Sequence, residues 1–245
     1  MKLRVGTWNV QYGWGAEKNA RRLELLRRLD ADIWVLTETN DALDLSSTHR
    51  AVSTQRRFPV EPGSRWVTIW SRLALAGSEI TEDSDRTVAA RFTTLGGTEV
   101  LVYGTVLPWM HDKGPDPSAP AQGWSELHRV TPIQGAEWLR LRTTYAEAVM
   151  VVAGDLNQNL GGNHYYGTQQ SRTLLRAALA AASLECLTTT ERFAPGELDH
   201  PPIDCVCVGA PHGRRLHSVV TGWNNTTADG HRLSDHSGVL AEFDL

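Results

Sequence analysis

Residues 149–159 read Val-Met-Val-Val-Ala-Gly-Asp-Leu-Asn-Gln-Asn and join an apolar run to a polar segment. An unbroken, largely β-branched apolar run predicts a strand that is covered on both faces of a sheet. Gly154 then permits a sharp turn of the backbone at the strand end. Asp155 and Asn157 follow on the predicted loop, the position where rigid scaffolds present chemistry. A simple Asx turn after a strand has the same composition, so the other strand ends decide between the two interpretations.

The remaining elements indicate a mixed α/β fold. Strands are predicted at 3–10, 33–36, 66–71, 87–93, 99–107, 203–208 and 239–243. Helices are predicted at 17–29, 126–148 and 170–182. Residues 3–36 have the strand–helix–strand order of a crossover unit, and 216–220 is predicted to be the hairpin partner of 203–208. Both helix–strand alternation and strand–strand runs occur, which favours mixed rather than parallel sheets. The first helix carries arginines interpreted as a solvated face: Arg21, Arg22, Arg27 and Arg28.

Length and composition describe a globular protein, and we expect one domain over residues 1–245. The net charge of −4 argues against a general nucleic-acid coat protein but leaves room for a local basic patch. The N-terminus lacks the apolar core of a signal peptide, and no apolar run approaches the ~20 residues that cross a bilayer. The cysteines, Cys186, Cys205 and Cys207, lack metal-type spacing. We therefore expect a reduced, cytoplasmic setting without membrane insertion, and nothing indicates a protein partner.

Polar and charged side chains stand at or beside several predicted strand ends. They are Asn9, Glu38, Asp155, Asn157, Asp204, Asp235 and His236. An oxygen-rich, sulfur-free set of this kind suits Mg²⁺ or Mn²⁺, the usual partners of phosphates, rather than zinc or copper. A further carboxylate can activate water, and an imidazolium can stabilise an anionic phosphoryl group. The set therefore contains the parts needed for metal-assisted hydrolysis of a phosphoester.

Five short motifs resemble those of the endonuclease/exonuclease/phosphatase superfamily, the deoxyribonuclease-I-like proteins, in order and spacing. They are Trp8-Asn9-Val10, Leu36-Thr37-Glu38-Thr39, Gly154-Asp155-Leu156-Asn157, Ile203-Asp204 and Ser234-Asp235-His236. Each motif is weak alone, but the ordered set is specific and covers residues 3–243. The resemblance implies a four-layer α/β sandwich of two mixed β-sheets flanked by helices.

The resemblance also implies a role for each matching residue. Glu38 would bind the metal ion, Mg²⁺ or Mn²⁺, with help from Asn9 and Asp235. Asp155 would activate the attacking water, and Asn157 would hold that water or the phosphate. His236 would contact the scissile phosphate, while Asp204 would hold its imidazole in one tautomer or charge state. Asp204 lies within an apolar strand and needs a partner there, because an unpaired buried carboxylate is costly.

One position departs from the family pattern. Between Tyr103 and Trp109 the family usually places a His or a Tyr that assists the leaving group or the phosphate, but Val106 stands at the expected position. Valine can neither donate a proton nor bind an oxyanion. His111 lies five residues further on, in a Pro- and Gly-rich loop over 108–123, and is the nearest candidate for a general acid. The alternative for a lone loop histidine is simple solvation.

The sequence therefore predicts a metal-dependent phosphoester hydrolase whose best single assignment is a nuclease acting on nucleic acid. A phosphatase or phospholipase that acts on a small or lipid phosphoester is one alternative. A catalytically weak module that binds phosphate or nucleic acid is another, suggested by Val106. Trp109 and Trp223 lie in predicted loops near the site, where they would either stack on bases or cover the rim of the core.

Overall fold

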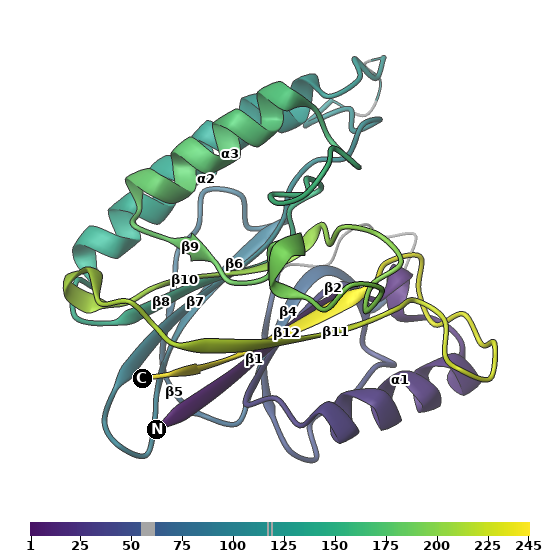
Figure 1. Cartoon of the computed structure of the whole chain (residues 1–245), viewed down its shortest axis with the longest axis horizontal. Helices are drawn as coiled ribbons and strands as arrows, with labels where there is room; N and C mark the ends of the chain where they lie inside the picture. Colours follow the sequence, from purple (N-terminus) through teal and green to yellow (C-terminus); the bar gives the residue numbers. More distant parts are fainter. Residues whose placement is uncertain (55–61, 117, 119) are drawn as a thin grey trace.

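The computed structural model describes residues 1–54, 62–116, 118 and 120–245, and its strands form two stacked six-stranded sheets (Figure 1). The first sheet has the order β11 (Ser218–Trp223), β12 (Gly238–Asp244), β1 (Lys2–Asn9), β2 (Ile33–Asn40), β4 (Ser64–Ser71) and β3 (Arg50–Ser53). The second has the order β5 (Ala74–Glu79), β6 (Thr87–Thr93), β7 (Glu99–Val106), β8 (Val149–Asp155), β10 (Asp204–Gly209) and β9 (Glu185–Cys186). The helices are α1 (Ala16–Leu29), α2 (Ser125–Thr144) and α3 (Gln169–Ala181), with short 3-10 turns at Gln11–Gly13, Thr190–Arg192 and Pro211–Gly213.

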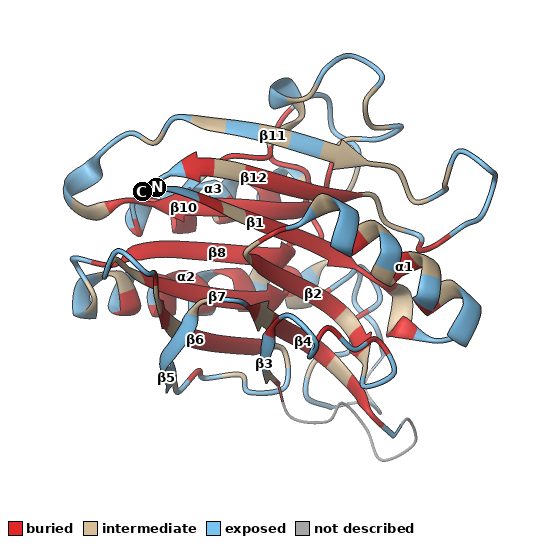
Figure 2. Cartoon of the chain, turned by 90° about the horizontal axis from the view of Figure 1, so that it is seen from below, coloured by how far each residue is buried: buried red, intermediate tan, exposed pale blue. Residues whose placement is uncertain are grey.

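Three apolar clusters hold four layers together. The largest lies between the two sheets and includes Val35, Val67, Val151 and Val206. A second cluster joins the second sheet to α2 and α3, and a third joins the first sheet to α1. Figure 1 shows α2 and α3 on one outer side of the sheets and α1 on the other, and Figure 2 shows the buried central strands. The predicted four-layer sandwich is therefore confirmed. None of the described helices is long and apolar enough to cross a membrane.

Two parallel strand pairs bring the polar strand ends to one edge of the sandwich. The predicted crossover is present, because β1 and β2 run parallel with α1 between them. The pair β7–β8 is also parallel, with α2 between its strands, and the other described pairs are antiparallel. Parallel strands end on the same side of a sheet, so Asn9 lies beside Thr37 and Val106 lies beside Asp155.

The hairpin predicted between 203–208 and 216–220 is wrong. Strand β10 is already paired on both sides, with β8 and with β9, so it has no free edge. After β10 the chain crosses to the first sheet, where β11 pairs with β12. The helix predicted to reach 148 ends at Thr144, and β8 starts four residues after Tyr145.

Gly154 lies inside β8 and does not form the predicted turn. The strand continues to Asp155, which is its last residue. Gly154 has φ 138°, and a Cβ atom built on it would lie 1.9 Å from the carbonyl oxygen of Thr105. The glycine therefore allows β7 to approach the backbone that carries Asp155, and no other residue fits there without a shift of one strand.

We expect Gly154→Ala to lower the free energy of unfolding by ~3 kcal/mol or more, because the methyl group overlaps backbone atoms rather than a movable side chain. Gly97→Ala is the matched control. Gly97 also has a positive φ, 82°, but nothing lies within 4 Å of a Cβ there, so only the ~1 kcal/mol of backbone strain applies. Urea unfolding measures both variants, and equal losses would contradict the assignment.

Candidate active site

Most of the predicted site residues line one cavity of about 320 Å³ at this edge of the sandwich. The lining residues are Gln11, Tyr12, Glu38, Trp66, Arg86, Val106, Trp109, Asp155, Asn157, Tyr166, Asp235 and His236. Two predicted residues, Asn9 and Asp204, are buried behind this lining and contact it through hydrogen bonds. His111 is exposed and is not among the lining residues.

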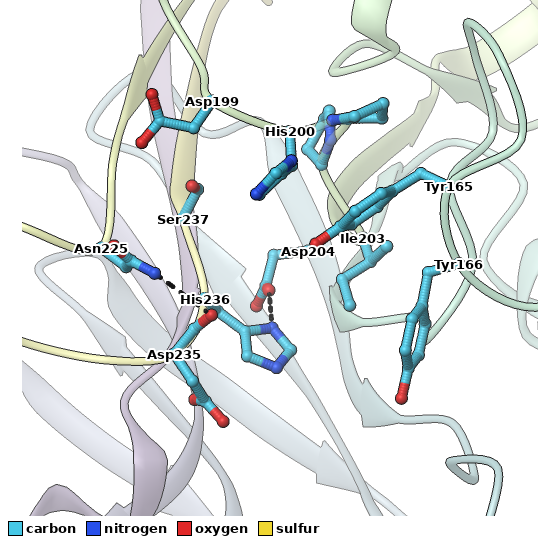
Figure 3. A pocket seen from close by; sticks show the side chains of 12 residues that line it. Tyr165, Tyr166, Asp199, His200, Ile203, Asp204, Asn225, Asp235, His236 and Ser237 are labelled. Carbon is cyan, nitrogen blue, oxygen red and sulfur yellow. Dashed lines mark hydrogen bonds and ion pairs between the residues drawn. The ribbon is translucent and has the colours of Figure 1, made fainter.

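The centre of the site is a histidine that lies against two buried carboxylates. Asp155 and Asp204 are direct partners across the antiparallel strands β8 and β10. The His236 Nδ1 atom lies 2.7 Å from Asp204 Oδ2, and its Nε2 atom lies 4.0 Å from Asp155 Oδ2. The predicted Asp204–His236 contact is therefore present, and Figure 3 shows it from the neighbouring cavity. The second Asp204 oxygen, Oδ1, is buried without a hydrogen-bond partner in the described chain.

The charges of these three groups depend on one another. Burial raises the pKa of Asp155, and the nearby Asp204 carboxylate raises it further, whereas the charge of His236 lowers it. Burial alone would lower the pKa of His236, but Asp155 and Asp204 together raise it above its ordinary value. His236 is thus favoured as an imidazolium, the form that can donate hydrogen bonds from both ring nitrogens.

Two asparagines fix the Asp155 carboxylate. The Asn9 Nδ2 atom donates to Asp155 Oδ2 at 3.1 Å, and the Asn157 backbone N–H donates to Oδ1 at 2.9 Å. The Asn157 side chain donates to the carbonyl oxygen of Leu107 at 2.7 Å, which ties the loop after β8 to the end of β7. The Asn9 side-chain oxygen accepts the backbone N–H of Gln11 at 2.9 Å. These contacts restrict Asp155 to one orientation toward the cavity.

Glu38 reaches the cavity from an unusual backbone position. Its φ is 50°. Thr37 and Thr39 on either side pair with residues of β4, but the register between β2 and β4 does not include Glu38, although β2 continues to Asn40. A non-glycine residue in the left-handed region is strained, and such residues concentrate at functional sites. Asp235 enters from the loop before β12. The preceding Ser234 hydroxyl donates to the Asn9 carbonyl oxygen at 2.6 Å and accepts the His236 backbone N–H at 3.1 Å, which docks this loop on β1.

The donor chemistry of the cavity fits a divalent cation. Asp155, Asp204 and His236 offer ligand atoms within 4.8 Å of one another. The hydrogen bond between Asp204 and His236 already engages two of these groups, but Glu38 and Asp235 add carboxylate oxygens to the cavity that Asp155 and His236 line. Carboxylate oxygens are the ligands that hard cations prefer.

Arg86 is a cavity residue that the sequence analysis missed. Its Nη2 atom lies 2.6 Å from the buried Asp112 carboxylate, and its guanidinium lies over the ring of Trp66 at 4.9 Å. Its Nη1 atom is buried and has no hydrogen-bond partner among the described residues. Arg86 lies just before β6, and the only sequence signal is a basic residue at a strand start, which is too common to single out. It brings a positive charge to the wall that also contains Val106.

The loop residues predicted to flank the site behave differently from one another. Trp109 lines the cavity and is 46% exposed, and the His111 ring packs edge-on against it at 5.2 Å. Trp223 is the last residue of β11 rather than a loop residue, and it is half-buried. Its ring packs edge-on against Trp8 and Trp34, at 5.9 and 6.0 Å. Trp223 therefore belongs to the core rim, while the predicted acid role of His111 stays a prediction.

A second cavity of about 370 Å³ opens on the same histidine. Figure 3 shows Tyr165, Tyr166 and His200 on one wall, opposite Asp235 and His236. The rings of Tyr165 and His200 are stacked, with their centroids 4.8 Å apart and an interplanar angle of 9°. The acidic centre thus has an aromatic wall on one side.

Arg22 is buried, and its assignment to a solvated face is wrong. Its guanidinium donates to the Leu233 carbonyl oxygen at 2.6 and 2.9 Å, to the Trp14 carbonyl oxygen at 3.1 Å and to Asn19 Oδ1 at 2.7 Å. It shares one face of α1 with Asn19 and Leu26, at spacings of three and four residues, and this face meets the sheet. Burial lowers the pKa of Arg22 to about 10. The side chain positions the segment that leads into Ser234, Asp235 and His236.

The two stacked mixed sheets and the polar cavity at their edge define the class of deoxyribonuclease-I-like sandwiches. The chain belongs to the Endonuclease/Exonuclease/phosphatase family, which matches residues 6–236. Members of this superfamily are metal-dependent nucleases and phosphatases, that is, phosphoester hydrolases. A search of curated proteins gave no match.

Solved structures share the fold at low identity. The human nocturnin catalytic domain with bound sulfate has a TM-score of 0.70 and 16% identity, over 99% of this chain and 93% of that one. The D. rerio TDP2 complexed with single strand DNA product has a TM-score of 0.65 and 16% identity, over 100% and 99%. An AP endonuclease from Archaeoglobus fulgidus has a TM-score of 0.64 and 15% identity, over 99% and 100%. These likenesses establish the fold alone.

We expect Arg22→Met to lower the free energy of unfolding by ~2–4 kcal/mol, because it leaves the Leu233 and Trp14 carbonyl oxygens without their donor. Arg28→Met on the exposed face of α1 is the matched control and should stay within ~0.5 kcal/mol of wild type. Denaturant unfolding compares the two, and a neutral Arg22→Met would show that the buried guanidinium is dispensable.

Proposed function

We propose that this protein is a Mg²⁺- or Mn²⁺-dependent phosphodiesterase, and specifically a nuclease. The observation that carries the proposal is the buried Asp155–His236–Asp204 arrangement in a cavity that also contains Glu38 and Asp235. A protein that only bound phosphate would have little reason to gather carboxylates around an anion, since like charges repel. Hydrolysis explains them, because it needs a base and a cation.

In the proposed reaction, Asp155 accepts the proton of the attacking water. Burial raises its pKa, so the carboxylate is a better base than an exposed aspartate. Asn9 and Asn157 hold its two oxygens, which leaves the carboxylate in a single orientation. His236, as an imidazolium oriented by Asp204, donates a hydrogen bond to a non-bridging oxygen of the scissile phosphate.

Glu38 and Asp235 are the residues that would hold the cation, with Asn9 behind them. When bound, the ion neutralises phosphate charge and assists departure of the leaving alkoxide. The strained backbone of Glu38 supports this role, because strain persists where the surrounding structure enforces it for function.

Arg86 takes over the charge stabilisation that Val106 cannot provide. Arg86 and Val106 line the same cavity, and the Arg86 Nη1 atom is buried without a hydrogen-bond partner among the described residues. A guanidinium stays protonated at every ordinary pH, so Arg86 binds phosphate oxygens but does not donate a proton to the leaving group. His111, exposed beside Trp109, is the remaining candidate for that proton.

Nucleic acid is the substrate that the surroundings of the site favour. The aromatic wall of Tyr165, Tyr166 and His200 and the exposed ring of Trp109 offer stacking surfaces for bases. A relative in fold, D. rerio TDP2, is described in complex with a single strand DNA product, which supports single-stranded ends as the first substrates to test. A cytoplasmic location is part of the same proposal. A phosphatase for a small phosphoester is the second candidate, since a cavity of about 320 Å³ also accommodates one.

A screen of single-stranded DNA, duplex DNA, abasic DNA, RNA and soluble phosphoesters with Mg²⁺ or Mn²⁺ tests the assignment. We expect cleavage of single-stranded nucleic acid that disappears with a chelator. Asp155→Asn should lower kcat by ~10³-fold, because the base is lost while the shape is kept. Exclusive turnover of phosphomonoesters would establish the phosphatase instead, and no turnover of any substrate would exclude both.

Calorimetric titration of Mn²⁺ tests the cation site independently of substrate. We expect Glu38→Gln to weaken binding at least ~10-fold, because a charged ligand oxygen is lost. Glu24→Gln, an exposed residue of α1, removes the same charge away from the cavity and should leave binding unchanged. Equal affinities in wild type and Glu38→Gln would remove Glu38 from the site.

Two substrates with different leaving groups distinguish the proposed role of Arg86 from that of His111. We expect Arg86→Met to slow an ordinary phosphodiester and a nitrophenyl phosphodiester equally, by ~10²-fold, because both lose a charge on the phosphate. If His111 is the general acid, His111→Ala should slow only the ordinary substrate, by a similar factor, since nitrophenolate leaves without a proton. No effect of His111→Ala on either substrate would exclude it as the acid.

A further inference from the structure

All three cysteines of the chain meet on the second sheet, outside the candidate active site. Cys205 and Cys207 are buried in the cluster that joins this sheet to α2 and α3, and the half-buried Cys186 packs against them from β9. No other cysteine exists in the sequence, so every sulfhydryl of the protein belongs to this cluster.

The strand register selects one pair from the three. Cys186 is the direct partner of Cys207 across the antiparallel strands β9 and β10. The Leu187 N–H donates to the Val206 carbonyl oxygen at 2.9 Å, so the neighbouring pair of Cys186 and Cys207 is a non-hydrogen-bonded one. Cα atoms in such pairs lie about 4.5 Å apart, within the range of about 4.4–6.8 Å that disulfides span.

Cys205 is placed less well for a disulfide. It is the diagonal neighbour of Cys186, two residues from the direct partner. Diagonal positions across a sheet are separated by about 7–8 Å between Cα atoms, which exceeds the reach of a disulfide without movement of the backbone. Its thiol also donates to the Ile203 carbonyl oxygen at 3.8 Å.

Cys186 is the most solvent-exposed of the three cysteines and therefore the most accessible to a small molecule. It lines a cavity of about 350 Å³ together with Gly161, Arg176 and Glu191, whereas Cys205 and Cys207 are almost completely buried. The neighbouring Cys205 and Cys207 side chains lower the pKa of Cys186, whereas Cys186 and burial raise the pKa values of Cys205 and Cys207. A half-buried thiol on a cavity wall next to a buried thiol is the arrangement of a reactive and a resolving cysteine.

We propose that Cys186 and Cys207 are a reversible redox pair, in which hydrogen peroxide oxidises Cys186 and Cys207 then closes a cross-strand disulfide. The Cys186 sulfur attacks one peroxide oxygen and the O–O bond breaks. The leaving hydroxide takes up the proton lost from the Cys186 thiol and forms the first water, and Cys186 becomes a sulfenic acid. The Cys207 sulfur then attacks the Cys186 sulfur, the S–O bond breaks, and the Cys207 proton leaves with the hydroxide as water. Two thiols and one peroxide thus give one disulfide and two waters, and a dithiol reductant reverses the change.

The test treats the folded full-length protein with hydrogen peroxide, then denatures it in iodoacetamide and measures the intact mass. We expect wild type to lose two hydrogen atoms and to take up one alkyl group, where the reduced protein takes up three. Dithiothreitol before alkylation should restore all three. This readout does not depend on the proposed nuclease activity, so either proposal can fail alone.

Cys205 and Cys207 lie within one tryptic peptide, residues 193–214, so the mass of a disulfide-linked peptide does not show which of them is joined to Cys186. Single variants therefore identify the pair. Cys205→Ser is the matched control and should still close the disulfide, with no alkyl group added. Cys186→Ser and Cys207→Ser should form none, and in Cys207→Ser the sulfenic acid on Cys186 should be trapped by dimedone. Circular dichroism verifies that each variant is folded. Three alkylatable thiols in peroxide-treated wild type, or a disulfide that survives Cys207→Ser, would overturn the proposal.

Discussion

Two buried carboxylates that face one another across adjacent strands impose the main constraint on this protein. Asp155 and Asp204 are direct partners in the second sheet, and like charges at such positions repel. Burial away from water makes the pair more costly still. The compensating charge is the His236 ring, which comes from the loop before β12 of the first sheet. The two sheets of the sandwich therefore depend on each other electrostatically at this edge, in addition to the apolar layer between them.

The loop that supplies the histidine is fixed by contacts with both neighbouring layers. The Trp8 Nε1 atom donates to the His236 carbonyl oxygen at 2.9 Å, and the Ser234 hydroxyl donates to the Asn9 carbonyl oxygen. Arg22 on α1 holds the Leu233 carbonyl oxygen from the opposite side. The outer helix, the first sheet and the loop thus position one ring against a carboxylate pair in the other sheet. This preorganisation requires that α1 and the two sheets assemble together, since none of these three layers holds the ring alone.

Backbone strain gathers around the same cavity. Of the non-glycine residues with positive φ in the described chain, Gln11, Tyr12, Glu38 and Asn157 all line it, with φ between 47° and 67°. Each left-handed residue costs ~1–2 kcal/mol, so their concentration needs local compensation. Part of that compensation is visible as hydrogen bonds, from the Gln11 N–H to Asn9 and from the Asn157 side chain to Leu107. The strained backbone at these positions directs side chains into the cavity, whereas a relaxed strand end would direct them elsewhere.

What the sequence predicts well are features set by local pattern, and what it misses are features set by distant partners. Apolar runs ending in carboxylates predicted the strand ends, and parallel pairing then brings those ends together. The burial of Arg22 depends on carbonyl oxygens of Trp14 and Leu233, which no helical periodicity reveals. Strand 216–220 was assigned to the wrong sheet because sequence proximity does not show that both edges of β10 are occupied. The placement of Cys186 beside Cys207 likewise follows from register rather than from spacing.

Val106 differs from the expected family residue in a way that the sequence shows, but the residue that supplies a positive charge in its place is visible only in the structure. It is the direct neighbour of Asp155 in the parallel pair β7–β8, so it stands beside the residue that acts as base in the proposed reaction. A valine there excludes water from one side of the carboxylate and adds to the burial that raises the Asp155 pKa. In the proposed reaction the positive charge comes from Arg86, in the turn before β6, where Asp112 and the Trp66 ring hold the guanidinium. An arginine stabilises charge but gives up no proton. In the proposed reaction, phosphate binding and proton donation therefore fall to separate residues, two tasks that a single histidine would combine.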